Sequence, residues 1–508
     1  MPGTSLFTRQ RVLLLALVSL AALALLAAWM IDRMGIAPRS LGPYLERRAQ
    51  GHHPLVEGLG QRIGRALVAL DRGEPMSFAL PPLAIGAQGS VHPPAAIAGK
   101  RNNASDERTV LVDSAAAART AIEHAQPGDV ITFLPGTYYF DSHALRAGEA
   151  GTAAKPITVR AQQPGSATLR FAITEGFRVS KPYWIFENLT IQGVCSEHAN
   201  CEHAFHVVSD ASHFIARNNV VSDFNAHFKI NGEGGKYPDH GLIAANTLTN
   251  TSVRLTNKPV TPIDMVGASN WLIEGNLITD FIKGDGNRVS YGAFAKGAGS
   301  GNRFQQNIVL CEHRLRGLPG QRVGLSFGGG GTGTPFCRDR RCITEHDGGI
   351  IENNLIAFCS DDGIYLNRAS TARVAHNTLL DTAGITVRFA VSSADIEGNL
   401  VDGIIRSRDD GVARATDNLA GSMVLSYLGL HPVRDLFQQT QFLDLAWRKK
   451  PPVRNAGSLA PGVDLCNEKR PSLTAYGAFA DFAACLKGRG AVQDDSAEQA
   501  LPFVATRS

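Results

Sequence analysis

Short apolar segments that end in a polar corner recur along most of this chain. WIFENLTI, FIARNNVV, LIAANTLT, LIEGNLIT, RFQQNIVL, IIENNLIA, RVAHNTLL and DIEGNLVD share two apolar or small residues, two variable residues, an Asn and then β-forming residues. Aligning these copies places the repeated Asn at Asn188, Asn218, Asn246, Asn276, Asn307, Asn354, Asn377 and Asn399. The spacings of 30, 28, 30, 31, 47, 23 and 22 residues are typical of a solenoid.

The segments are rich in Val, Ile, Leu, Phe and Thr and are closed by Gly, Asn or Asp, which predicts strands rather than helices. An isolated coil would expose its apolar face, so neighbouring coils must stack strand on strand. An Asn at the same turn of every coil can bond to the next Asn, and Asn tolerates the left-handed φ of a tight corner. We therefore expect these Asn residues to form an internal ladder at a corner, with a structural role.

The N-terminal region has a different pattern. TRQR precedes the apolar run 12–31, in which Ser19 is the only polar residue. At about 1.5 Å per residue the run spans roughly 30 Å, one bilayer core. A cleaved signal peptide is the alternative, but no small-x-small cleavage site follows the run. Arg9 and Arg11 favour a cytoplasmic segment 1–11, which predicts a single-pass anchor in the inner (plasma) membrane and a periplasmic or extracellular body.

The remaining chain divides by pattern. Residues 32–108 predict a membrane-proximal segment with one amphipathic stretch, LVEGLGQRIGRALVAL, followed by a linker rich in Pro, Ala, Gly and Asn. An Ala-rich helix that ends at Pro127 then precedes the first coil, where it can plug the open end of the solenoid core. The repeats fill 109–430, and 431–508 predicts a C-terminal cap or packing arm.

Composition narrows the choice of partners and compartment. Charged residues make up 19% of the chain and the formal net charge is +4, which argues against disorder and against a nucleic-acid partner. The eight cysteines fit an oxidising compartment, and spacings of six and five residues in CSEHANC and CRDRRC fit loop disulfides better than a zinc site. We expect four pairs: Cys195–Cys201, Cys337–Cys342, Cys311–Cys359 and Cys466–Cys485.

A second line of strands carries charged residues at alternate positions. AFHVVS, HFKING, PIDMVG, GAFAKG, GLSFGG, GIYLNR and TVRFAV predict successive strands of one sheet. If Phe205, Phe228, Ile263, Leu325, Ile364 and Val387 point inward, the outward residues are His206, Lys229, Asp264, Ser326, Tyr365 and Arg388. Lys296 points outward only if a bulge turns it or if Ala293 and Ala295 point inward. At about 4.8 Å per coil these residues span roughly 30 Å, the length of a groove for several sugar units. An ordinary solvated sheet face is the alternative.

Loops beside this face add candidate ligands. HFKINGEGGKYPDHG carries His227, Asn231 and Glu233, and CSDDGIYLNR carries Asp362 and Arg368. We expect His206, His227, Asp362 and Arg368 to contact the substrate. Asn231, Glu233 and Asp264 supply oxygens of the type that Ca²⁺ takes, so Ca²⁺ is the expected ion if a metal is bound.

The interval of 47 residues between Asn307 and Asn354 contains an insertion, where a β-helix places a groove wall or lid. Its basic residues, with Arg322 and His346 among them, predict contact with an acidic polymer, and a solvated basic loop is the alternative. Its Gly run lacks the Lys and the Ser or Thr of a phosphate-binding loop, so the sequence does not indicate nucleotide binding.

The opening AIEHAQPGDVITFLPGTYYF, followed by the Asn-bearing repeats, resembles the right-handed parallel β-helix superfamily of pectate lyases over about residues 109–430. The resemblance implies an all-β fold, a single right-handed parallel β-helix with an N-terminal capping helix, here preceded by the transmembrane helix. Such folds host lyases, hydrolases, epimerases and binders, so the activity depends on the site.

Within that superfamily, KGAGSGNRFQQN is similar to a motif of the chondroitinase B and alginate lyase family, with a gap two residues longer. The resemblance implies that Lys296 is the base that abstracts a proton. The Glu pair that binds Ca²⁺ in that family is replaced by NRVSYGAF, and the Arg expected one coil later by LSFGG. Lys229, Arg388 or a differently placed Ca²⁺ must then neutralise the substrate.

Elimination from a uronate needs a cation for the carboxylate, a base for the C5 proton and an acid for the leaving oxygen. We expect a lyase or C5-epimerase of an acidic polysaccharide, with Lys296 and Lys229 as bases or neutralisers and Tyr365 and Arg388 on the acid side. A noncatalytic polysaccharide-binding or envelope scaffold protein is one alternative. A glycoside hydrolase is the other, and it would need two carboxylates about 5 to 9.5 Å apart.

Overall fold

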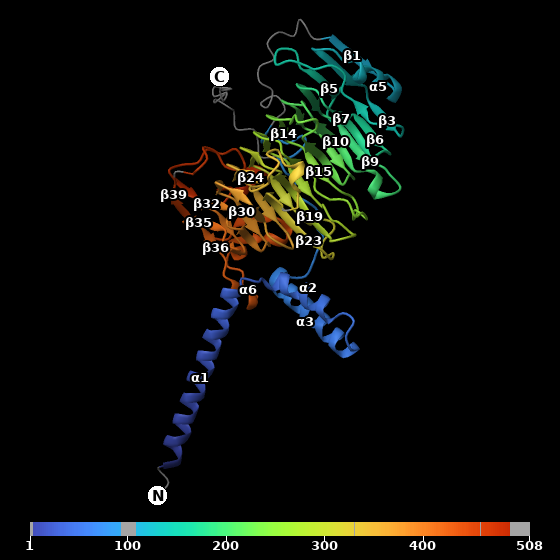
Figure 1. Ribbon diagram of the computed structural model, residues 1–508. Coiled ribbons are helices and arrows are strands. Elements are labelled where there is room, and N and C mark those ends of the chain that lie inside the picture. Colours follow the sequence, from blue (N-terminus) through green and yellow to red (C-terminus); the bar gives the residue numbers. More distant parts are fainter. Residues whose placement is uncertain (1–3, 93–107, 330, 458, 488–508) are drawn as a thin grey trace.

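The computed structural model describes residues 4–92, 108–329, 331–457 and 459–487 (Figure 1). Within these ranges the chain forms a right-handed parallel β-helix, as expected, with an N-terminal apolar helix below it. Much of the predicted linker, 93–107, and the last part of the predicted C-terminal arm, 488–508, lie outside the described residues.

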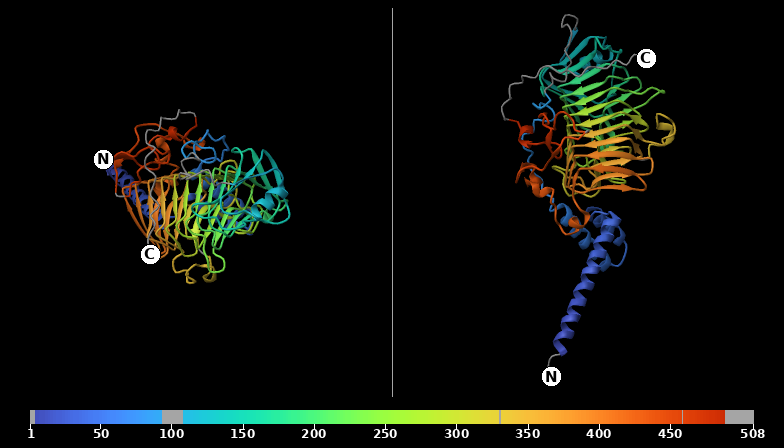
Figure 2. Two further views of the ribbon diagram at one scale, coloured as in Figure 1. Left: turned by 90° about the horizontal axis from the view of Figure 1, so that it is seen from above. Right: turned by 90° about the vertical axis from the view of Figure 1, so that its left-hand side faces the viewer.

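Three long parallel sheets run the length of the β-helix, because each coil adds one strand to each sheet. Sheet 1 contains β1 (Arg108–Val112), β2 (Asp129–Phe133), β5 (Ile157–Ala161), β8 (Trp184–Glu187), β11 (Ile215–Arg217), β14 (Leu242–Ala244), β17 (Leu272–Glu274), β21 (Arg303–Gln305), β25 (Ile350–Glu352), β29 (Ala372–Ala375), β32 (Ser393–Glu397) and β35 (Val412–Thr416). Sheet 2 contains β4 (Leu145–Arg146), β7 (Glu175–Val179), β10 (His203–Val208), β13 (Ala226–Asn231), β16 (Ile263–Val266), β19 (Val289–Lys296), β23 (Gln321–Phe327), β27 (Ile364–Asn367), β31 (Gly384–Arg388) and β34 (Ile404–Arg408). Sheet 3 contains β3 (Gly136–Phe140), β6 (Ala167–Phe171), β9 (Thr190–Gly193), β12 (Val220–Ser222), β15 (Thr247–Thr249), β18 (Leu277–Thr279), β22 (Ile308–Leu310), β26 (Leu355–Ala357), β30 (Thr378–Leu380), β33 (Leu400–Val401) and β36 (Leu419–Ala420). The side view in Figure 2 shows these strands stacked coil upon coil.

A file of stacked Asn side chains lies at the corner between sheets 1 and 3. The Nδ2 of Asn276 donates to the Oδ1 of Asn307 at 2.9 Å, and the backbone nitrogen of Asn276 donates to the same oxygen at 3.0 Å. This pattern repeats from coil to coil, so each amide is satisfied by the next. The ladder residues are Asn219, Asn246, Asn276, Asn307, Asn354, Asn377, Asn399 and Asn418.

Two details of the predicted ladder were wrong. Asn219 rather than Asn218 occupies the second position, and Leu189 rather than Asn188 begins the file, since its backbone nitrogen donates to Asn219. The left-handed φ also belongs to the residue before each ladder Asn, for example 56° at Asn218 and 63° at Gly275. Two successive residues therefore have different roles at each corner: the first adopts the left-handed φ of the turn, and the second hydrogen-bonds to the neighbouring coils.

Apolar side chains fill the interior, and a helix covers its first coil. Phe177, Phe205 and Phe228 stack on one another with ring centroids 5.1 and 5.0 Å apart, one ring per coil. The capping helix α5 (Ala115–Glu123) buries Ala118 and Ile122 against this core, as predicted. Small strands β20 (Gly299–Ser300), β24 (His346–Asp347) and β28 (Ala369–Ser370) form a fourth parallel sheet beside sheet 2.

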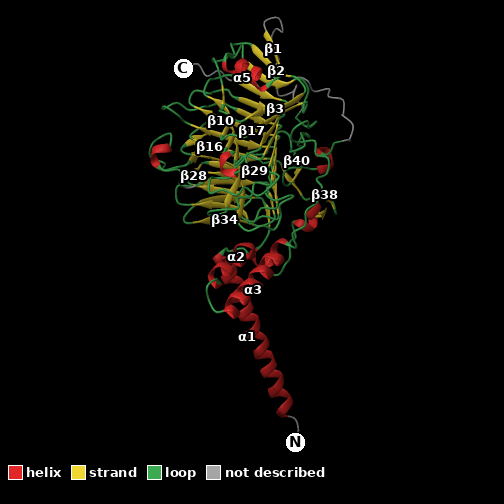
Figure 3. Cartoon of the chain, turned by 90° about the vertical axis from the view of Figure 1, so that its right-hand side faces the viewer, coloured by secondary structure: helices red, strands yellow, loops and turns green. Residues whose placement is uncertain are grey.

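All four predicted disulfides are present: Cys195–Cys201, Cys311–Cys359, Cys337–Cys342 and Cys466–Cys485. The last of these lies in the C-terminal segment, which packs sideways against sheet 3 together with residues 78–91. This arm includes the antiparallel pairs β37 (Phe437–Gln439) with β38 (Asp444–Trp447), and β39 (Val453–Asn455) with β40 (Leu473–Ala475). Figure 3 shows it along the flank of the β-helix.

The helical N-terminal region lies at the opposite end from α5 (Figures 1 and 3). Helix α1 (Thr4–Met34) is followed by a hairpin of α2 (Pro38–Ala49) and α3 (Pro54–Arg72), and the short α6 (Met423–Tyr427) contacts both α1 and α3. Among the described residues, one helix is long and apolar enough to cross a membrane: α1, over Leu14–Asp32. A signal sequence near an N-terminus meets the same criterion.

A buried cluster of charges, here called the junction cluster, fixes the hairpin to the β-helix. Arg39 pairs with Asp71 at 2.6 Å and with Asp381 of the β-helix at 3.1 Å, and Arg72 pairs with Glu312 at 3.2 Å. Although burial raises the pKa of the Asp381 carboxyl, Arg72 and Arg39 hold it below its ordinary value. The cluster comprises Arg39, Asp71, Arg72, Glu312, Arg316, Arg322, Asp381, Asp402 and Arg434.

Candidate functional site

The outer face of sheet 2 carries two rows of side chains, because strand pairing brings one residue of each coil into register. The first row is Arg178, His206, Lys229, Asp264, Phe294, Ser326, Tyr365, Thr386 and Arg406. The second row lies two residues further along each strand and includes Asn231, Val266, Lys296, Asn367, Arg388 and Arg408. Their neighbours in sequence, such as Phe205 and Ile230, belong to the core.

The register settles the direction of Lys296. Ala293 and Ala295 are fully buried in the core, so Phe294 and Lys296 point outward without a bulge between them. Arg388 also points outward, but it pairs with Asn367 and lies in the second row rather than beside Tyr365. The predicted single line of polar groups is therefore two adjacent rows, with Lys296 and Arg388 in the same one.

Lys296 occupies a half-buried position at the end of β19. Its Nζ lies 4.4 Å from the centre of the Phe294 ring, over the aromatic face. Burial lowers the pKa of the Lys296 ammonium below its ordinary value; Asp264 opposes this shift and Lys229 adds to it. A lysine whose charged form is disfavoured is unprotonated in a larger fraction of molecules than a solvated one, so its amine is more often available as a base.

Lys229 and Asp264 face each other on adjacent coils of the first row. The Nζ of Lys229 lies 2.8 Å from the Oδ1 of Asp264, and the carboxylate is nearly sealed from solvent, whereas Lys229 remains partly exposed. This ion pair places the Lys229 ammonium, whose charge the Asp264 carboxylate offsets, near Lys296. Lys229 can therefore meet a substrate carboxylate without losing its own partner.

A network of charges occupies the first row nearer the capped end. The Nδ1 of His206 lies 2.8 Å from Glu175 and its Nε2 lies 3.0 Å from the Oδ1 of Asn231. Arg178 donates to Glu233 at 2.6 Å. The hydrogen bond from His206 lowers the pKa of Glu175 to about 2, so this carboxylate stays ionised.

Tyr365 and Arg388 form a bonded pair at the other end of the rows. The phenol oxygen of Tyr365 accepts from Arg388 at 3.2 Å and from Asn367 at 3.1 Å. Arg388 also lies 4.5 Å over the Phe389 ring and bonds to Asp409. A phenol that accepts two hydrogen bonds has its own proton free to donate outward.

The insertion between Asn307 and Asn354 borders the second row, as predicted for a wall. Arg338 bonds to both carboxylate oxygens of Asp239, at 2.8 and 2.9 Å, and its guanidinium lies 4.7 Å over the Tyr237 ring. Glu345 accepts from the backbone nitrogen of Gly297, next to Lys296, and from Thr332. These bonds attach the insertion to the strand end that carries Lys296.

Three residues expected to bind substrate are buried away from both rows. His227 is sealed in the interior with its Nε2 on the carbonyl of Thr249, and burial lowers its pKa to about 3. His346 stacks on Phe327 at 4.2 Å, and burial lowers its pKa to about 3. Arg322 belongs to the junction cluster, 2.8 Å from Glu312. Their predicted substrate contacts were wrong, because each side chain already has a buried partner.

Two further expected residues lie at the edges of the rows. Asp362 adjoins Asp361 at the start of β27, 3.5 Å from Arg406 of the first row. Burial, and then repulsion by Asp362, raises the pKa of Asp361. Arg368 is exposed and lies 5.6 Å over the Phe389 ring that Arg388 also covers.

The expected Ca²⁺ ligands do not fit a metal in this arrangement. Asp264 is engaged by Lys229, Glu233 by Arg178 and Asn231 by His206, so each residue already gives an oxygen to a different donor. A Ca²⁺ site needs several oxygens free to converge on one ion. In the described ranges, the one group of three or more potential His, Cys, Asp or Glu ligands includes Cys337 and Cys342, which form a disulfide.

The structure also adds residues that the sequence reasoning missed. Phe294 and Tyr291 form an edge-to-face pair with ring centroids 5.4 Å apart, beside Lys296. Arg178 and Glu175 extend the rows by one coil toward the cap. Their strand, GFRVS, shows the same alternation as AFHVVS, so the pattern itself could have found them.

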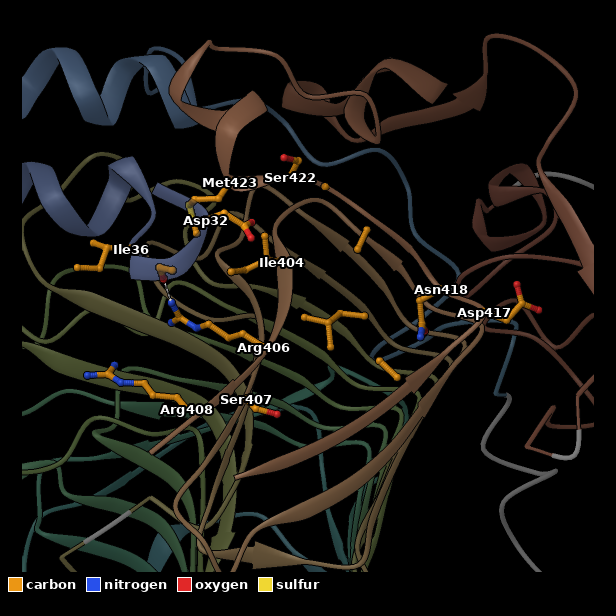
Figure 4. Close-up of a pocket in the computed structure, with 15 residues that line it drawn as sticks. Asp32, Ile36, Ile404, Arg406, Ser407, Arg408, Asp417, Asn418, Ser422 and Met423 are labelled. Carbon is orange, nitrogen blue, oxygen red and sulfur yellow. Dashed lines mark hydrogen bonds between the residues drawn. The ribbon is translucent and has the colours of Figure 1, made fainter. Parts of the chain in front are cut away.

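A cavity of about 800 Å³ lies elsewhere, at the open end of the β-helix next to α1 (Figure 4). Ile404, Arg406 and Arg408 line it from the last coil, and Ile36 and Met423 from the helices. In Figure 4 the Arg406 side chain points to the end of α1, where it bonds to the carbonyl of Gly35. Arg406 and Arg408 are the last members of the two rows, whereas the candidate catalytic residues Lys296 and Tyr365 do not line this cavity.

Comparison with known proteins gives likenesses of fold. No model of a protein family matches the chain, and no curated protein matches it in sequence. Pectate lyase Pel9A is 14% identical, with 74% of this chain and 97% of that chain covered and a TM-score of 0.48. The alginate lyase from Paenibacillus sp. str. FPU-7 is 15% identical, with 62% and 98% covered and a TM-score of 0.37. The PL6 family polysaccharide lyase from Pseudopedobacter saltans is 13% identical, with 68% and 97% covered and a TM-score of 0.34.

Proposed function

We propose that this chain is a polysaccharide lyase that cleaves an acidic, uronate-containing polymer by β-elimination along the outer face of sheet 2. The observation that carries the proposal is the state of Lys296: its pKa is lowered by burial, and it points outward in the second row, which also holds Arg388, beside the first row, which holds Lys229. Such a row suits a polymer with one carboxylate per sugar, since several units can be held at once.

Each step of the reaction has a candidate group on the two rows. Lys229 and Arg388 offset the charge of the uronate carboxylates. Lys296 takes the C5 proton, the released electron pair forms the C4–C5 double bond, and the C4–O bond breaks. Tyr365 gives its proton to the leaving oxygen, and Arg388 stabilises the phenolate that results. Tyr291, which is partly exposed beside Lys296, offers an aromatic face against which a sugar ring can stack.

Lys296 and Tyr365 are two coils apart and lie in different rows, so their backbones are about 12 Å apart at the usual strand spacing and rise per residue. Both side chains are long, so together they can bracket one sugar unit. A C5-epimerase would use the same proton abstraction but would return a proton from the other face without breaking the C4–O bond.

We also propose that α1 anchors the enzyme in the inner membrane with the β-helix on the periplasmic side. The apolar length of Leu14–Asp32 supports the span, and the four disulfides support an oxidising compartment for the body.

The test uses the full chain in detergent with alginate, pectate and chondroitin. A lyase increases ultraviolet absorbance as its unsaturated product forms, and Lys296→Met abolishes that increase. If new reducing ends form without a rise in ultraviolet absorbance, the enzyme is a hydrolase, for which Asp361 is the candidate acid, and the lyase proposal is wrong. Uptake of deuterium at C5 from heavy water without cleavage would replace it with epimerisation. Binding with none of these signals would leave a scaffold protein. The assay is also run with a metal chelator, and we expect the activity to be unchanged.

A further inference from the structure

The hairpin of α2 and α3 has an unusual outer surface. Along α3, Leu55, Leu59, Ile63 and Leu70 follow one another at helical spacing and form a single apolar stripe. Their side chains are between 40% and 78% exposed, which is high for consecutive members of one apolar face. The opposite face of α3 packs on α2 through Gly60 and Gly64, which is why the stripe is left uncovered by the hairpin itself.

The apolar surface continues onto a segment far away in the sequence. Gly429 lies against Leu70, and the adjacent Leu428 is 62% exposed. The carbonyl of Leu70 is also bonded to His431 at 3.2 Å, so α6 and the end of α3 are held together. We call Leu55, Leu59, Ile63, Leu70 and Leu428 the basal patch.

Exposed cations flank the basal patch. Arg62 and Arg65 lie on α3 beside the stripe, and Arg47 and Arg48 lie on α2. None of the four takes part in an ion pair with another residue in the described ranges, in contrast to Arg39 and Arg72 of the junction cluster. An apolar stripe accompanied by exposed arginines whose charge no carboxylate offsets is the pattern of a helix that lies in the interface of an anionic bilayer.

The position of the hairpin gives the second argument. Helices α2 and α3 extend sideways from the point where α1 ends, with α3 on the side of α1 (Figures 1 and 3). If α1 spans a bilayer, its C-terminal end at Asp32 is at the membrane surface, and the hairpin leaves it along that surface. The junction cluster fixes the hairpin in this position.

We propose that the basal patch lies in the headgroup region of an anionic phospholipid bilayer, so that the β-helix stands on the membrane with two contacts, α1 and α3. This inference depends on the anchoring role proposed for α1. It adds a second lipid contact that sets how the body is oriented, since a single helix with a short connection would leave the body free to tilt.

The test places an environment-sensitive fluorophore, through a genetically encoded amino acid, at position 59 of the full chain. Position 255 is the matched control, because Leu255 on the β-helix is 60% exposed and Leu59 is 59% exposed. The protein is reconstituted in vesicles of phosphatidylcholine with phosphatidylglycerol. We expect a blue shift, loss of quenching by aqueous iodide and quenching by headgroup-labelled lipid at position 59, and none of these at position 255.

Retention of the chain on vesicles after an alkaline wash reports on α1 separately. A chain that is washed off contradicts the anchor, and the patch proposal is lost with it. A chain that is retained while position 59 stays open to iodide contradicts the patch proposal alone. Protection from iodide without quenching by labelled lipid, together with cross-linking between copies, would assign the basal patch to a second copy of the chain and would also overturn the proposal.

Discussion

The Asn ladder and the outward rows of sheet 2 are both built from one position per coil, yet they differ in every other respect. The ladder repeats the same residue through eight coils, buried and bonded to its own kind. The first row changes at almost every coil, through Arg178, His206, Lys229, Asp264, Phe294 and Tyr365. A solenoid needs the same residue where its coils bond to each other and permits different residues elsewhere, so the varied polar residues in register make this the candidate functional face.

The largest effect on activity is expected for Lys296→Met, which changes an outward row and leaves the Asn ladder intact. We expect turnover to fall about 10²- to 10⁴-fold, the usual contribution of a general base, equivalent to about 3 to 5 kcal/mol. The free energy of unfolding should not fall, because the substitution removes a half-buried charge and leaves no buried partner unpaired. Product absorbance and urea unfolding measure the two quantities.

Lys236→Met is the matched control, because Lys236 is exposed and pairs with Asp210 outside the rows. An equal loss of activity in Lys236→Met would contradict the proposed role of Lys296 as the base.

For Asn307→Ala, on the same coil, we expect a loss of stability with little loss of activity. Asn307 donates to Asn354 and to the carbonyl of Ile273, and it accepts from Asn276, so the variant leaves buried groups on the two neighbouring coils unpaired. We expect a loss of about 2 to 4 kcal/mol in the free energy of unfolding. Activity measured at urea concentrations well below the unfolding midpoint should be nearly unchanged. A strong loss of turnover in the folded variant would contradict the purely structural role of the ladder.

Tyr365→Phe tests the acid end of the rows. The variant keeps the ring and removes the hydroxyl that Arg388 and Asn367 bond, so we expect turnover to fall about 10- to 100-fold. The loss should shrink for a synthetic substrate with a better leaving group, which needs less protonation. An equal loss for both substrates would assign Tyr365 a positioning role instead.

The smallest effects are expected in the pH dependence. Lys296 acts unprotonated, so the rate rises as pH passes upward through its pKa. Lys229 lowers that pKa, so Lys229→Met should move the rise to higher pH; Asp264 raises it, so Asp264→Asn should move the rise to lower pH. Opposite displacements in profiles of kcat would confirm that one titrating group is near both residues, and displacements in the same direction would contradict this.

The sequence predicted features that depend on local pattern and missed those that depend on tertiary partners. Spacing of the Asn residues was sufficient for the β-helix, and close Cys spacing was sufficient for the disulfides Cys195–Cys201 and Cys337–Cys342. Arg388 was placed in the wrong row because a shift of two residues keeps a side chain on the same face while moving it about 7 Å along the strand. His227 and His346 were assigned to the surface because no local pattern reveals the carbonyl of Thr249 or the ring of Phe327 that bury them.

The order of strands in sheet 2 has a further consequence for a chain that is held by α1. β34 lies nearest the helix, and β19 follows after β31, β27 and β23, which places Lys296 about 19 Å above the last coil at the usual strand spacing. A short glycan still attached to a lipid carrier would be out of reach. Under the proposed anchor and the proposed lyase activity, the enzyme would act on polymer that has already grown clear of the bilayer, so chain length itself would become a condition for cleavage.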